Sequence, residues 1–548
     1  MNDNYTNNNI ENEDSSNNRF SNKKILLPIL FSFAIVLGIF IGNKLATNTQ
    51  NKPIQSDYTS SGGKLDMLFN LIDLQYVDTI DKEQLTERVI TETLSDLDPH
   101  STYIPADELQ LVNDDLESSF SGIGIQFNIQ RDTIMVVAVI HGGPSEKLGI
   151  QPGDRIIEIN DSSSVGKGIS SDQVIKKLRG PKGTKVKVGI QRFGADEKLH
   201  YTIVRGDVPT KSVDVSYMIQ KNVGYIKVSK FGSSTYEEFY DALTKLSDEG
   251  ATSFIVDLRE NSGGYLMAAT AIVNEFLQLN NLIVYTEGKA QKREDIYANG
   301  YGSYKKTPLA VLIDEWSASA SEIFAGAMQD NDRAIIIGRR SFGKGLVQKQ
   351  FEMTDNSAIR LTIARYYTPS GRCIQKPYND KDEYRKEVYK RYTNGELDSD
   401  TIKTINDSVK YYTTKGRVVY GGGGITPDII IARDTIGVTP YYTKLHNTGT
   451  IYEYAFRYVD EHRNSLSSMD YAQLTTYLDK QPLAQLTMQY GTKKGITEDR
   501  NISFVTKELI QRRSKEYIVR NILGDEGFYE LVNKSDNMVK AALEHLSK

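Results

Sequence analysis

The segment GRRSFGKG, Gly338–Gly345, carries residue types that suit two different chemistries. Its glycine spacing and Lys344 follow the apolar run AIII, which is typical of the start of a phosphate-binding loop. Such a loop also needs Ser or Thr after the lysine, where a helix opens with its amides facing the phosphate. Gly345 stands at that position, and the following GLVQKQFEM alternates like a strand. We therefore favour the second chemistry, in which Lys344 is an acid–base group.

Ser319 is the candidate nucleophile that such a lysine could activate. It lies among small residues between a strand predicted to end at Asp314 and a helix predicted to begin near Ser321. A serine at a strand-to-helix turn is exposed, and the amides of the helix N-terminus point towards a developing oxyanion. Composition alone also permits a different interpretation, because Ser317, Ser319 and Ser321 are all suitable helix N-caps.

A serine nucleophile needs a base, and histidine is not available here. The six histidines are dispersed along the chain, and none lies in the segment that carries Ser319. A lysine can be the base if its surroundings lower its pKa towards ~7–8. Lys344 is flanked by glycines and apolar residues, which disfavour solvation of an ammonium group. We predict that Ser319 and Lys344 lie side by side on neighbouring strand-end loops, with Gln348 placed to orient the lysine or the substrate.

A third strand-end loop, NSGG, spans Asn261–Gly264 and follows the predicted strand IVDLR. Two successive glycines let the backbone approach a substrate closely and adopt positive φ. An amide of Gly263 or Gly264, together with that of Ala320, could form an oxyanion hole. The alternative is an ordinary strand-to-helix turn with no role in chemistry.

Other kinds of site are not predicted. The chain has no H-E-x-x-H motif and its histidines are dispersed, so we expect no metal and no cofactor. The single cysteine, Cys373, leaves no partner for an intrachain disulfide, and the fold must be stable through its apolar cores. The formal net charge of -5 provides no overall basic field, so we expect no nucleic-acid partner.

The elements that must position these loops alternate between strands and helices from residue 207 to about 435. GYIKVSKF, ATSFIVDLR, PLAVLID and RAIIIG are predicted strands, separated by helices such as STYEEFYDALTKLSDEG and SASEIFAGAMQDN. This alternation predicts a layered α/β domain with parallel strands. A charged, tyrosine-rich segment of about 376–417 interrupts it, and we interpret this segment as a surface insertion.

The remainder of the chain divides by composition and periodicity. Residues 119–206 contain short period-two runs, glycine turns and one helix candidate, SDQVIKKL, which together predict a small β module. The other predicted regions are a disordered cytoplasmic N-terminus at 1–24, a transmembrane anchor or signal at 25–46, a linker at 47–63, a helical region at 64–118 and a mostly helical extension at 436–548.

The apolar run ILLPILFSFAIVLGIFIG, residues 25–42, is near the shortest stretch that spans a bilayer. It exceeds the ~7–15 residues of a signal-peptide core and no clear A-x-A site follows, so an uncleaved anchor is favoured over a cleaved signal. Arg19, Lys23 and Lys24 precede the run and are expected to stay on the cytoplasmic side. We therefore predict a single-pass membrane protein with the bulk of the chain on the exported side of the membrane.

Several blocks, in order, resemble those of the C-terminal processing peptidases, also called tail-specific proteases. They run from about Lys64 to Ile431 and are LDPHSTYI, SFSGIGIQF, LGIQPGDRIIEIN, IVDLRENSGGYL, SASASEIFAGAMQD, GRRSFGKGLVQ and LTIARYYTPSGRCIQ. The resemblance implies a serine endopeptidase with a crotonase-like α/β core and an inserted PDZ domain. It also implies that Ser319 is the nucleophile, Lys344 the general base and Gln348 the residue that assists the lysine.

The same resemblance assigns a peptide-binding role to the β module. In a PDZ domain, free amides hold the C-terminal carboxylate of a peptide, which adds as a strand at the sheet edge. The implied carboxylate-binding loop is Gly122, Ile123, Gly124 and Ile125, and the implied groove residues are Val174 and Leu178. The expected partners are exported proteins or peptides with free, apolar C-termini. A PDZ domain that acts only as a spacer is the alternative.

Two segments depart from the family pattern, namely the insertion of about 376–417 and the extension after about residue 435. Substrate choice, an adaptor partner or a homo-oligomer contact are the roles that the sequence leaves open for them. The leading hypothesis for the whole chain is a membrane-tethered serine endopeptidase with a Ser–Lys dyad. A membrane-tethered PDZ scaffold with a vestigial protease domain is the alternative, and an NTPase is a third.

Overall fold

The structure is a computed structural model. It describes residues 32, 34–41, 44 and 61–548, apart from 115, 116, 118, 131, 132, 165–167, 193, 402–408 and 498–501. Most of the predicted anchor or signal, and all of the predicted disordered N-terminus, therefore lie outside the described residues. Among the residues that are described, no helix is both long enough and apolar enough to cross a membrane.

The chain divides into two compact units, residues 1–88 and 89–548. The first unit contains helix α2 (Ser61–Gln75) and the start of helix α3 (Lys82–Leu97), whose end belongs to the second unit. Within the first unit, Lys82 and Asp73 form an ion pair of 2.5 Å. Both helices fall in the region for which helical periodicity was predicted.

The second unit is built around a mostly parallel sheet with the strand order β10-β11-β12-β15-β16-β21. The strands are β10 (Val213–Gln220), β11 (Val223–Val228), β12 (Ser253–Asp257), β15 (Leu309–Ile313), β16 (Ile335–Gly338) and β21 (Ile429–Ile430). Only the pair β10–β11 within this sheet is antiparallel. Strands β11, β12 and β15 are buried along their whole length, and their sequences are accordingly mostly apolar, without a break in β15.

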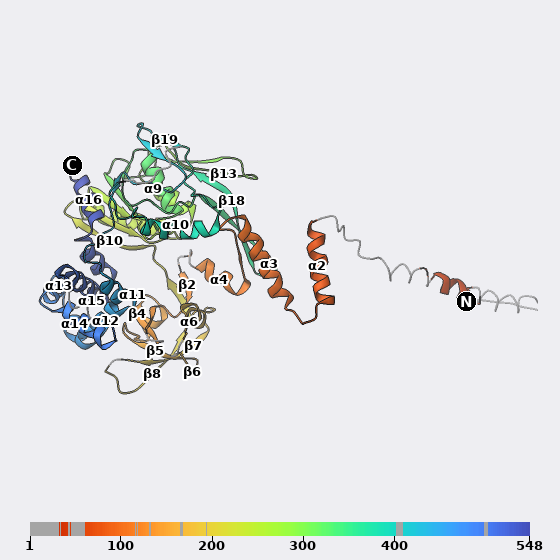
Figure 1. Cartoon of the computed structure of the whole chain (residues 1–548), viewed down its shortest axis with the longest axis horizontal. Helices are drawn as coiled ribbons and strands as arrows, with labels where there is room; N and C mark the ends of the chain where they lie inside the picture. The colour runs from red at the N-terminus through yellow and green to blue at the C-terminus, as the bar shows by residue number, and fades with distance from the viewer. Residues whose placement is uncertain are drawn as a thin grey trace, which may run out of the picture. The chain divides into compact units, whose positions relative to one another are not determined.

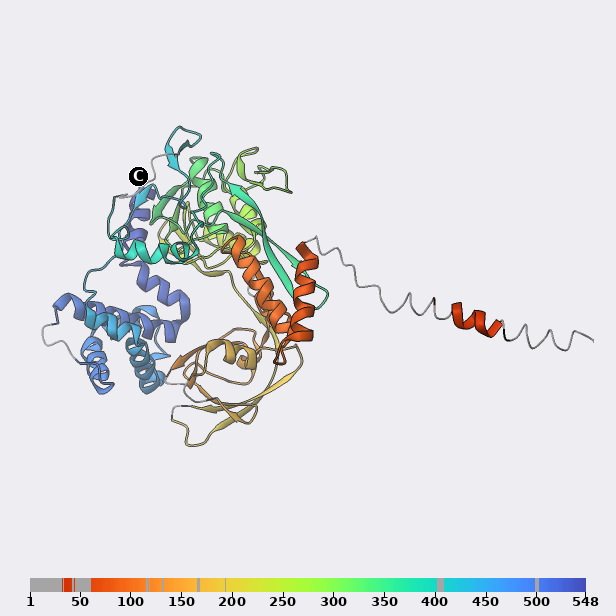
Figure 2. The same ribbon diagram turned by 45° about the vertical axis from the view of Figure 1, so that its right-hand side comes forward.

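Helices cover both faces of this sheet (Figure 1 and Figure 2). On one face lie α7 (Thr235–Asp248), α8 (Leu266–Asn274) and α9 (Ala320–Asp330), whose apolar side chains share one core with the sheet. The other face is covered by α16 (Asn537–Leu546), through Met538, Val539 and Ala542. This layered arrangement confirms the α/β prediction. The sequence pattern did not indicate that the last helix of the chain completes the core.

A second, antiparallel sheet carries the residues that follow the FGKG block. Its strands are β1 (Thr102–Ile104), β18 (Ala358–Tyr367), β13 (Leu282–Glu287) and β14 (Glu294–Tyr297), with β17 (Leu346–Glu352) paired to β18. Strand β1 comes from the DPHSTYI segment, which lies inside the region predicted to be helical. It pairs with β18, with Thr102 opposite Arg360. This pairing brings the LDPHS turn next to the strand hairpin β17–β18.

The predicted β module is a separate small sheet with its own apolar core. Its strands are β3 (Ile125–Gln130), β4 (Thr133–Val139), β5 (Arg155–Ile159), β6 (Ser162–Ser163), β7 (Lys185–Gln191) and β8 (Leu199–Val204), and β2 (Ser119–Gly122) pairs with β9 (Gly206–Pro209). Helices α5 (Pro144–Lys147) and α6 (Ser171–Leu178) belong to it, and α4 (Ala106–Asp114) precedes it. Helix α6 begins with a capping box between Ser170 and Gln173, as its sequence favours.

The tyrosine-rich segment contains helix α10 (Lys381–Thr393) and strand β19 (Lys410–Tyr412), which pairs with β20 (Val418–Tyr420) directly after the segment. Its interpretation as a surface insertion is only partly right, because Tyr384, Val388 and Arg391 of α10 are buried. The Arg391 guanidinium donates hydrogen bonds of 2.9 Å to the carbonyls of Arg340 and Ser341. The insertion therefore supports the loop that leads to Lys344.

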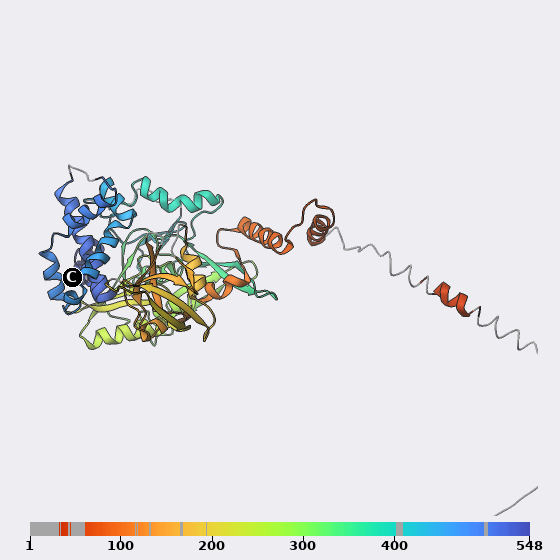
Figure 3. The same cartoon turned by 90° about the horizontal axis from the view of Figure 1, so that it is seen from below.

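The C-terminal extension is helical, as predicted. Its helices are α11 (Pro440–Asn447), α12 (Thr450–Leu466), α13 (Tyr471–Asp479), α14 (Leu483–Lys493) and α15 (Phe504–Asn533), followed by α16. Helices α11 to α15 pack around two apolar clusters of their own and form a compact group (Figure 3). Helix α15 is interrupted at Gly524, which has φ 70° and ψ -161°.

Candidate active site

The three candidate loops follow neighbouring parallel strands. Strands β12, β15 and β16 are adjacent in the sheet and run in the same direction. Their carboxyl ends therefore meet at one edge, where the loops with Asn261–Gly264, Ser319 and Lys344 begin. This is the arrangement that the sequence predicted, and ligand sites of open α/β sheets occur at such edges.

Ser319 lies in a strained turn directly before helix α9. Its φ of 53° and ψ of -112° place a residue with a side chain in a region that glycine normally occupies. Strain of this kind persists only where the surrounding structure holds it, and it is concentrated at functional sites. Gly263 presses on the turn: a Cβ there would lie 2.8 Å from the Cβ of Ser319 and 2.9 Å from the amide nitrogen of Ala320. Only glycine fits at this position of the NSGG loop.

Glu322 connects the turn that carries Ser319 to the loop that carries Lys344. Its Oε2 accepts hydrogen bonds of 2.9 Å from the amides of both Ser319 and Lys344. Its Oε1 accepts from the Gly343 amide at 2.7 Å and from the Ser341 hydroxyl at 2.5 Å. The side chain is completely buried. An acidic residue in the first turn of a helix is by itself only a helix start signal, and the sequence pattern does not indicate that Glu322 contacts a loop about twenty residues further on.

Tyr366 of strand β18 makes a second connection between the same two residues. Its hydroxyl lies 3.1 Å from the carbonyl oxygen of Ser319 and 2.5 Å from that of Lys344, so its single proton is shared between these two acceptors, with Lys344 as the nearer one. Ser319 and Lys344 are thus connected through their amides by Glu322 and through their carbonyls by Tyr366. The backbones of the predicted nucleophile and the predicted base are held next to each other.

Both side chains open into one cavity of about 980 Å³. Gln348, Gly263 and Gly264 also line it, so the structure brings together the predicted dyad, its predicted assistant and the glycine loop. Val112, Ile323 and Leu346 add apolar surface to the walls. A cleft with apolar walls and a few convergent polar groups is the usual form of a substrate site.

The surroundings of Lys344 favour its neutral form. Burial, and after it the positive charge of Arg360, lower the pKa of Lys344, while the charges of Glu322 and Asp98 oppose this effect. A lysine with a lowered pKa has a larger neutral fraction near neutral pH, as a general base requires. Burial raises the pKa of Glu322 to about 7, although the hydrogen bonds that its carboxylate accepts lower it.

The Arg360→Gln variant tests how Lys344 is kept neutral. Arg360 lines the cavity, and Gln350 Oε1 accepts its hydrogen bond at 2.9 Å. Without this positive charge the ammonium form of Lys344 becomes more favourable, so its pKa rises and the acid limb of kcat/KM moves to higher pH. The measurement is the pH profile of proteolysis, with Arg365→Gln on the same strand as the matched control. An acid limb that stays in place, or moves to lower pH, would contradict this explanation.

The predicted oxyanion hole needs one correction. The amide of Gly263 donates to Asn261 Oδ1 at 2.9 Å and is therefore occupied. Asn261 is fully buried, its Nδ2 donates to the Val228 carbonyl at 3.0 Å, and its carbonyl accepts from the Ala318 amide at 3.0 Å. Asn261 thus shapes the loop, and of the two alternatives for the first donor the amide of Gly264 remains, together with that of Ala320.

The structure also answers whether GRRSFGKG binds a phosphate. Lys344 and Gly345 lead into strand β17, and no helix opens there. The amides that a phosphate would need are already bound, those of Gly343 and Lys344 to Glu322 and that of Gly345 to Gln375 Oε1 at 2.8 Å. A buried carboxylate occupies the place of an anionic ligand, which excludes a phosphate-binding loop.

The residues predicted to bind peptide lie in two parts of the β module, the β2–β3 connection and helix α6. Gly122 ends β2, Ile125 begins β3, and Ile123 and Gly124 connect the two strands, with φ 78° at Gly124. The carbonyl of Ile123 accepts from the Ser145 amide at 2.9 Å. Val174 and Leu178 belong to the core of the module and are at most 3% exposed. Neither side chain is exposed to a peptide in this structure.

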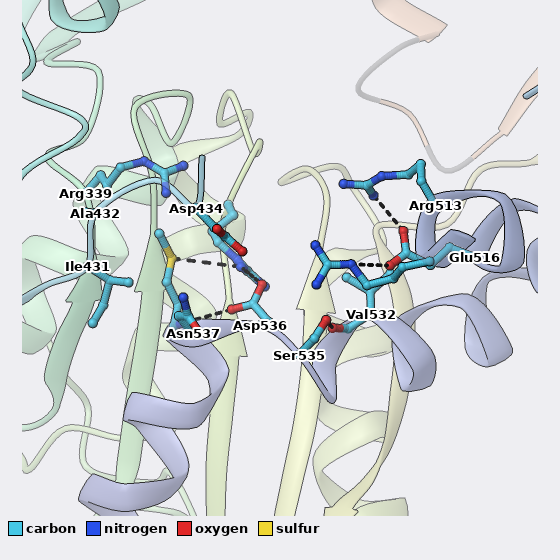
Figure 4. A pocket seen from close by; sticks show the side chains of 13 residues that line it. Arg339, Ile431, Ala432, Asp434, Arg513, Glu516, Val532, Ser535, Asp536 and Asn537 are labelled. Atoms are coloured by element: carbon cyan, nitrogen blue, oxygen red, sulfur yellow. Dashed lines mark hydrogen bonds and ion pairs between the residues drawn. The ribbon is translucent and has the colours of Figure 1, made fainter. Parts of the chain in front are cut away.

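A second cavity, of about 160 Å³, lies where the sheet meets helices α15 and α16 (Figure 4). Four arginines line it, and each has a carboxylate partner: Arg259 with Asp257 and Asp536, Arg339 with Glu315, and Arg512 and Arg513 with Glu516. We assign it to packing between the sheet and these helices. Within the described part of the chain, no cluster of histidine, cysteine and acidic residues could hold a metal ion.

The fold and the site define a class of protein, and comparison with known proteins identifies it. A model of peptidase family S41 matches residues 222–384, and a PDZ-domain model matches residues 135–192. A model of a family of unknown function, DUF8443, matches residues 441–524 in the C-terminal helices. The catalytic segment and the PDZ module are thus recognised separately.

Relatives that match this chain in sequence include carboxy-terminal-processing proteases. The chain is 34% identical over 347 residues to that of Bartonella bacilliformis, covering 62% of this chain and 79% of the relative. It is 34% identical over 363 residues to that of Synechocystis, covering 63% and 84%. With CtpB of Bacillus subtilis the values are 36% over 317 residues, 57% and 65%. The photosystem II D1 C-terminal processing protease structure aligns with 70% of this chain and 89% of its own, with a TM-score of 0.37 and 24% identity.

The chain belongs to peptidase family S41. It is a serine protease of the carboxy-terminal-processing type, with a PDZ domain and a helical C-terminal region.

Proposed function

We propose that Ser319 and Lys344 form a catalytic dyad that cleaves peptide bonds through an acyl-enzyme. Neutral Lys344 Nζ takes the proton of the Ser319 hydroxyl as Oγ attacks the scissile carbonyl carbon. The tetrahedral oxyanion accepts hydrogen bonds from the amides of Gly264 and Ala320. The Lys344 ammonium then protonates the leaving amine, the C–N bond breaks and an ester to Ser319 remains. Water, deprotonated by Lys344, hydrolyses the ester, and the proton returns to Ser319.

One observation carries this proposal: the backbones of Ser319 and Lys344 are linked on both sides. Glu322 Oε2 accepts from both amides, and the Tyr366 hydroxyl lies within hydrogen-bond distance of both carbonyls and shares its one proton between them. A contact between two segments with no role in chemistry would not require a strained φ at Ser319 or a buried carboxylate at the junction. The lowered pKa of Lys344 supports the role of base. Gln348, in the same cavity, assists the lysine.

The substrates we propose are exported proteins with free, apolar C-termini. Their carboxylate would bind the amides at Gly122–Ile125, and the peptide would add as a strand to the PDZ sheet. We further propose a single-pass protein of the bacterial inner membrane, held by residues 25–46, with its catalytic part periplasmic. The positive residues before the apolar run support this orientation. We also propose that the insertion and the extension contact an adaptor partner or a second copy of the chain.

Cleavage of matched reporters tests the proposed specificity. One reporter is an unfolded protein with a free C-terminus of three apolar residues, and the other ends in three aspartates. We expect the apolar tail to be cleaved with a kcat/KM about 10-fold higher, since one missing pocket contact is worth ~1.4 kcal/mol. Equal rates on both reporters would favour a PDZ domain that acts only as a spacer. Ser319→Ala is the control, and cleavage by this variant would refute the dyad.

A further inference from the structure

We propose that Asp98 and Thr362 are positioning residues that turn the amide of Gln348 so that its oxygen faces Lys344. The proposal rests on the proposed dyad and adds two residues to it. We call the hydrogen-bonded series Asp98, Thr362 and Gln348 the Asp98 chain. It joins the turn before β1 to the strand that carries Gln348.

Asp98 is the fixed end of this chain. Its Oδ1 accepts from the amides of His100 at 2.8 Å and Ser101 at 2.9 Å, and its Oδ2 accepts from the Ser101 hydroxyl at 2.6 Å. The side chain is buried, yet the pKa of Asp98 is lowered, because these hydrogen bonds outweigh the effect of burial. Asp98 is therefore an ionised acceptor with a fixed position.

Thr362 connects the Asp98 carboxylate to Gln348 in the hairpin β17–β18. Its hydroxyl lies 3.1 Å from Asp98 Oδ1 and donates to it, and its amide donates to the Ser101 hydroxyl at 3.1 Å. A hydroxyl has one proton, so with Asp98 as acceptor only its lone pairs remain for another partner. That partner is Gln348 Nε2, at 3.2 Å. The lone pairs of Thr362 select the NH₂ end of the glutamine, and its Oε1 is directed away from Thr362.

A register shift in the hairpin β17–β18 places Gln348 opposite Thr362. Val347 of β17 pairs with Ala364 of β18, but the next residue, Gln348, pairs with Thr362, so Ile363 is passed over. In a regular ladder Gln348 would lie opposite Ile363, whose side chain cannot accept a hydrogen bond. Bulges near active sites commonly re-aim a side chain in this way. The position of Thr362 opposite Gln348 is thus a specific feature of this hairpin.

The Asp98 chain fixes the orientation of the Gln348 amide, and this orientation affects Lys344. Lys344 and Gln348 line the same cavity, and neutral Lys344 has two N–H donors and one lone pair. When Gln348 Oε1 accepts one N–H, rotation about the Cε–Nζ bond is restricted, and the lone pair is directed towards the Ser319 hydroxyl. Loss of the Thr362 hydroxyl leaves the amide free to rotate and present its NH₂ to the lysine. Loss of the Thr362 hydroxyl should change substrate binding little, because the Asp98 chain acts on Lys344 and not on the substrate.

The experiment is a double-mutant cycle of Thr362→Val and Gln348→Ala on the full chain, with kcat and KM measured on an unfolded reporter protein. We expect Thr362→Val to lower kcat by about 10-fold, as a misplaced catalytic group does, with KM within about 2-fold. Thr362→Ser keeps the hydroxyl and should retain most of the wild-type kcat. In the Gln348→Ala background, Thr362→Val should cause no further loss, because both changes act through one amide.

The outcomes separate this proposal from the proposed function. If Ser319→Ala or Lys344→Met retains activity, the dyad itself is refuted. If those variants are inactive but Thr362→Val leaves kcat unchanged, raises only KM, or adds to the effect of Gln348→Ala, the Asp98 chain alone is overturned. If thermal melting shows that Thr362→Val does not fold, Asp98→Asn replaces it in the cycle, with the same expected loss of kcat and the same absence of additivity.

Discussion

Proteolysis by the Lys344→Met variant is expected to fall at least ~10⁴-fold in kcat/KM, with the fold intact. Methionine keeps most of the aliphatic length of lysine but cannot take a proton from the Ser319 hydroxyl. The Lys344 backbone interactions with Glu322 and Tyr366 remain, so the loop should keep its position. Since burial already disfavours the ammonium, its removal should not destabilise the protein.

The measurement for this first prediction is initial-rate cleavage of an unfolded reporter at a pH where the wild type is fully active. Lys349→Met is the matched control, because Lys349 lies in the same strand, β17, with an exposed side chain. The control should retain wild-type activity. If Lys344→Met stays within about 10-fold of the wild type, Lys344 is not the base.

Glu322→Gln is the second change with a large expected effect, on stability as well as on activity. Each carboxylate oxygen accepts two hydrogen bonds, and glutamine replaces one of these oxygens with an NH₂ group. In either orientation, buried donors of the two loops face another donor. An unsatisfied buried donor costs ~1–3 kcal/mol, so we expect a loss of about 2–4 kcal/mol in the free energy of unfolding. We also expect kcat to fall about 100-fold, because Ser319 and Lys344 lose their common partner.

Urea unfolding and kcat, measured where the variant is folded, test this second prediction. Asp330→Asn is the matched control: Asp330 lies in the same helix, α9, and its completely buried side chain pairs with Arg372 at 2.8 Å. This control should lose stability but keep kcat once folded. A folded Glu322→Gln with wild-type kcat would show that Glu322 has no role in holding the dyad.

The same carboxylate predicts a pH dependence. Burial raises the pKa of Glu322 from its ordinary 4.5 to about 7, so the folded protein holds this proton more tightly than the unfolded chain does. Ionisation of Glu322 therefore reduces the free energy of unfolding as pH rises from 4.5 to about 7, and its contribution is constant above that. Only the ionised form accepts all four hydrogen bonds, so we expect the dyad geometry to loosen as pH falls through 7. Glu322→Gln should remove this component of the stability profile.

Local patterns were sufficient to predict the parallel sheet and the loops at its edge. The predicted strands ATSFIVDLR, PLAVLID and RAIIIG contain β12, β15 and β16, and parallel strands bring their loops together. The helical character of the C-terminal extension also followed from local periodicity. The same periodicity did not show that α16 covers the sheet, because packing partners are not encoded in the pattern of one helix.

The residues that hold the dyad could not be predicted in this way. Tyr366 is 47 positions from Ser319, and Thr362 is 264 positions from Asp98, so neither contact has a local sequence signal. Arg391 is buried in a helix whose composition indicated a solvated surface. The Gly263 amide looked available in the sequence, but the Asn261 side chain two residues earlier binds it. Each of these roles depends on a contact that exists only after the chain has folded.

The most direct test of the central claim is the labelling of Ser319 by a fluorophosphonate probe, followed by mass spectrometry of the intact and digested protein. We predict a single adduct, on Ser319, whose rate of formation rises with pH as Lys344 loses its proton and becomes negligible in Lys344→Met. An adduct on another residue, or equal labelling of Ser319 in the wild type and in Lys344→Met, would contradict the account.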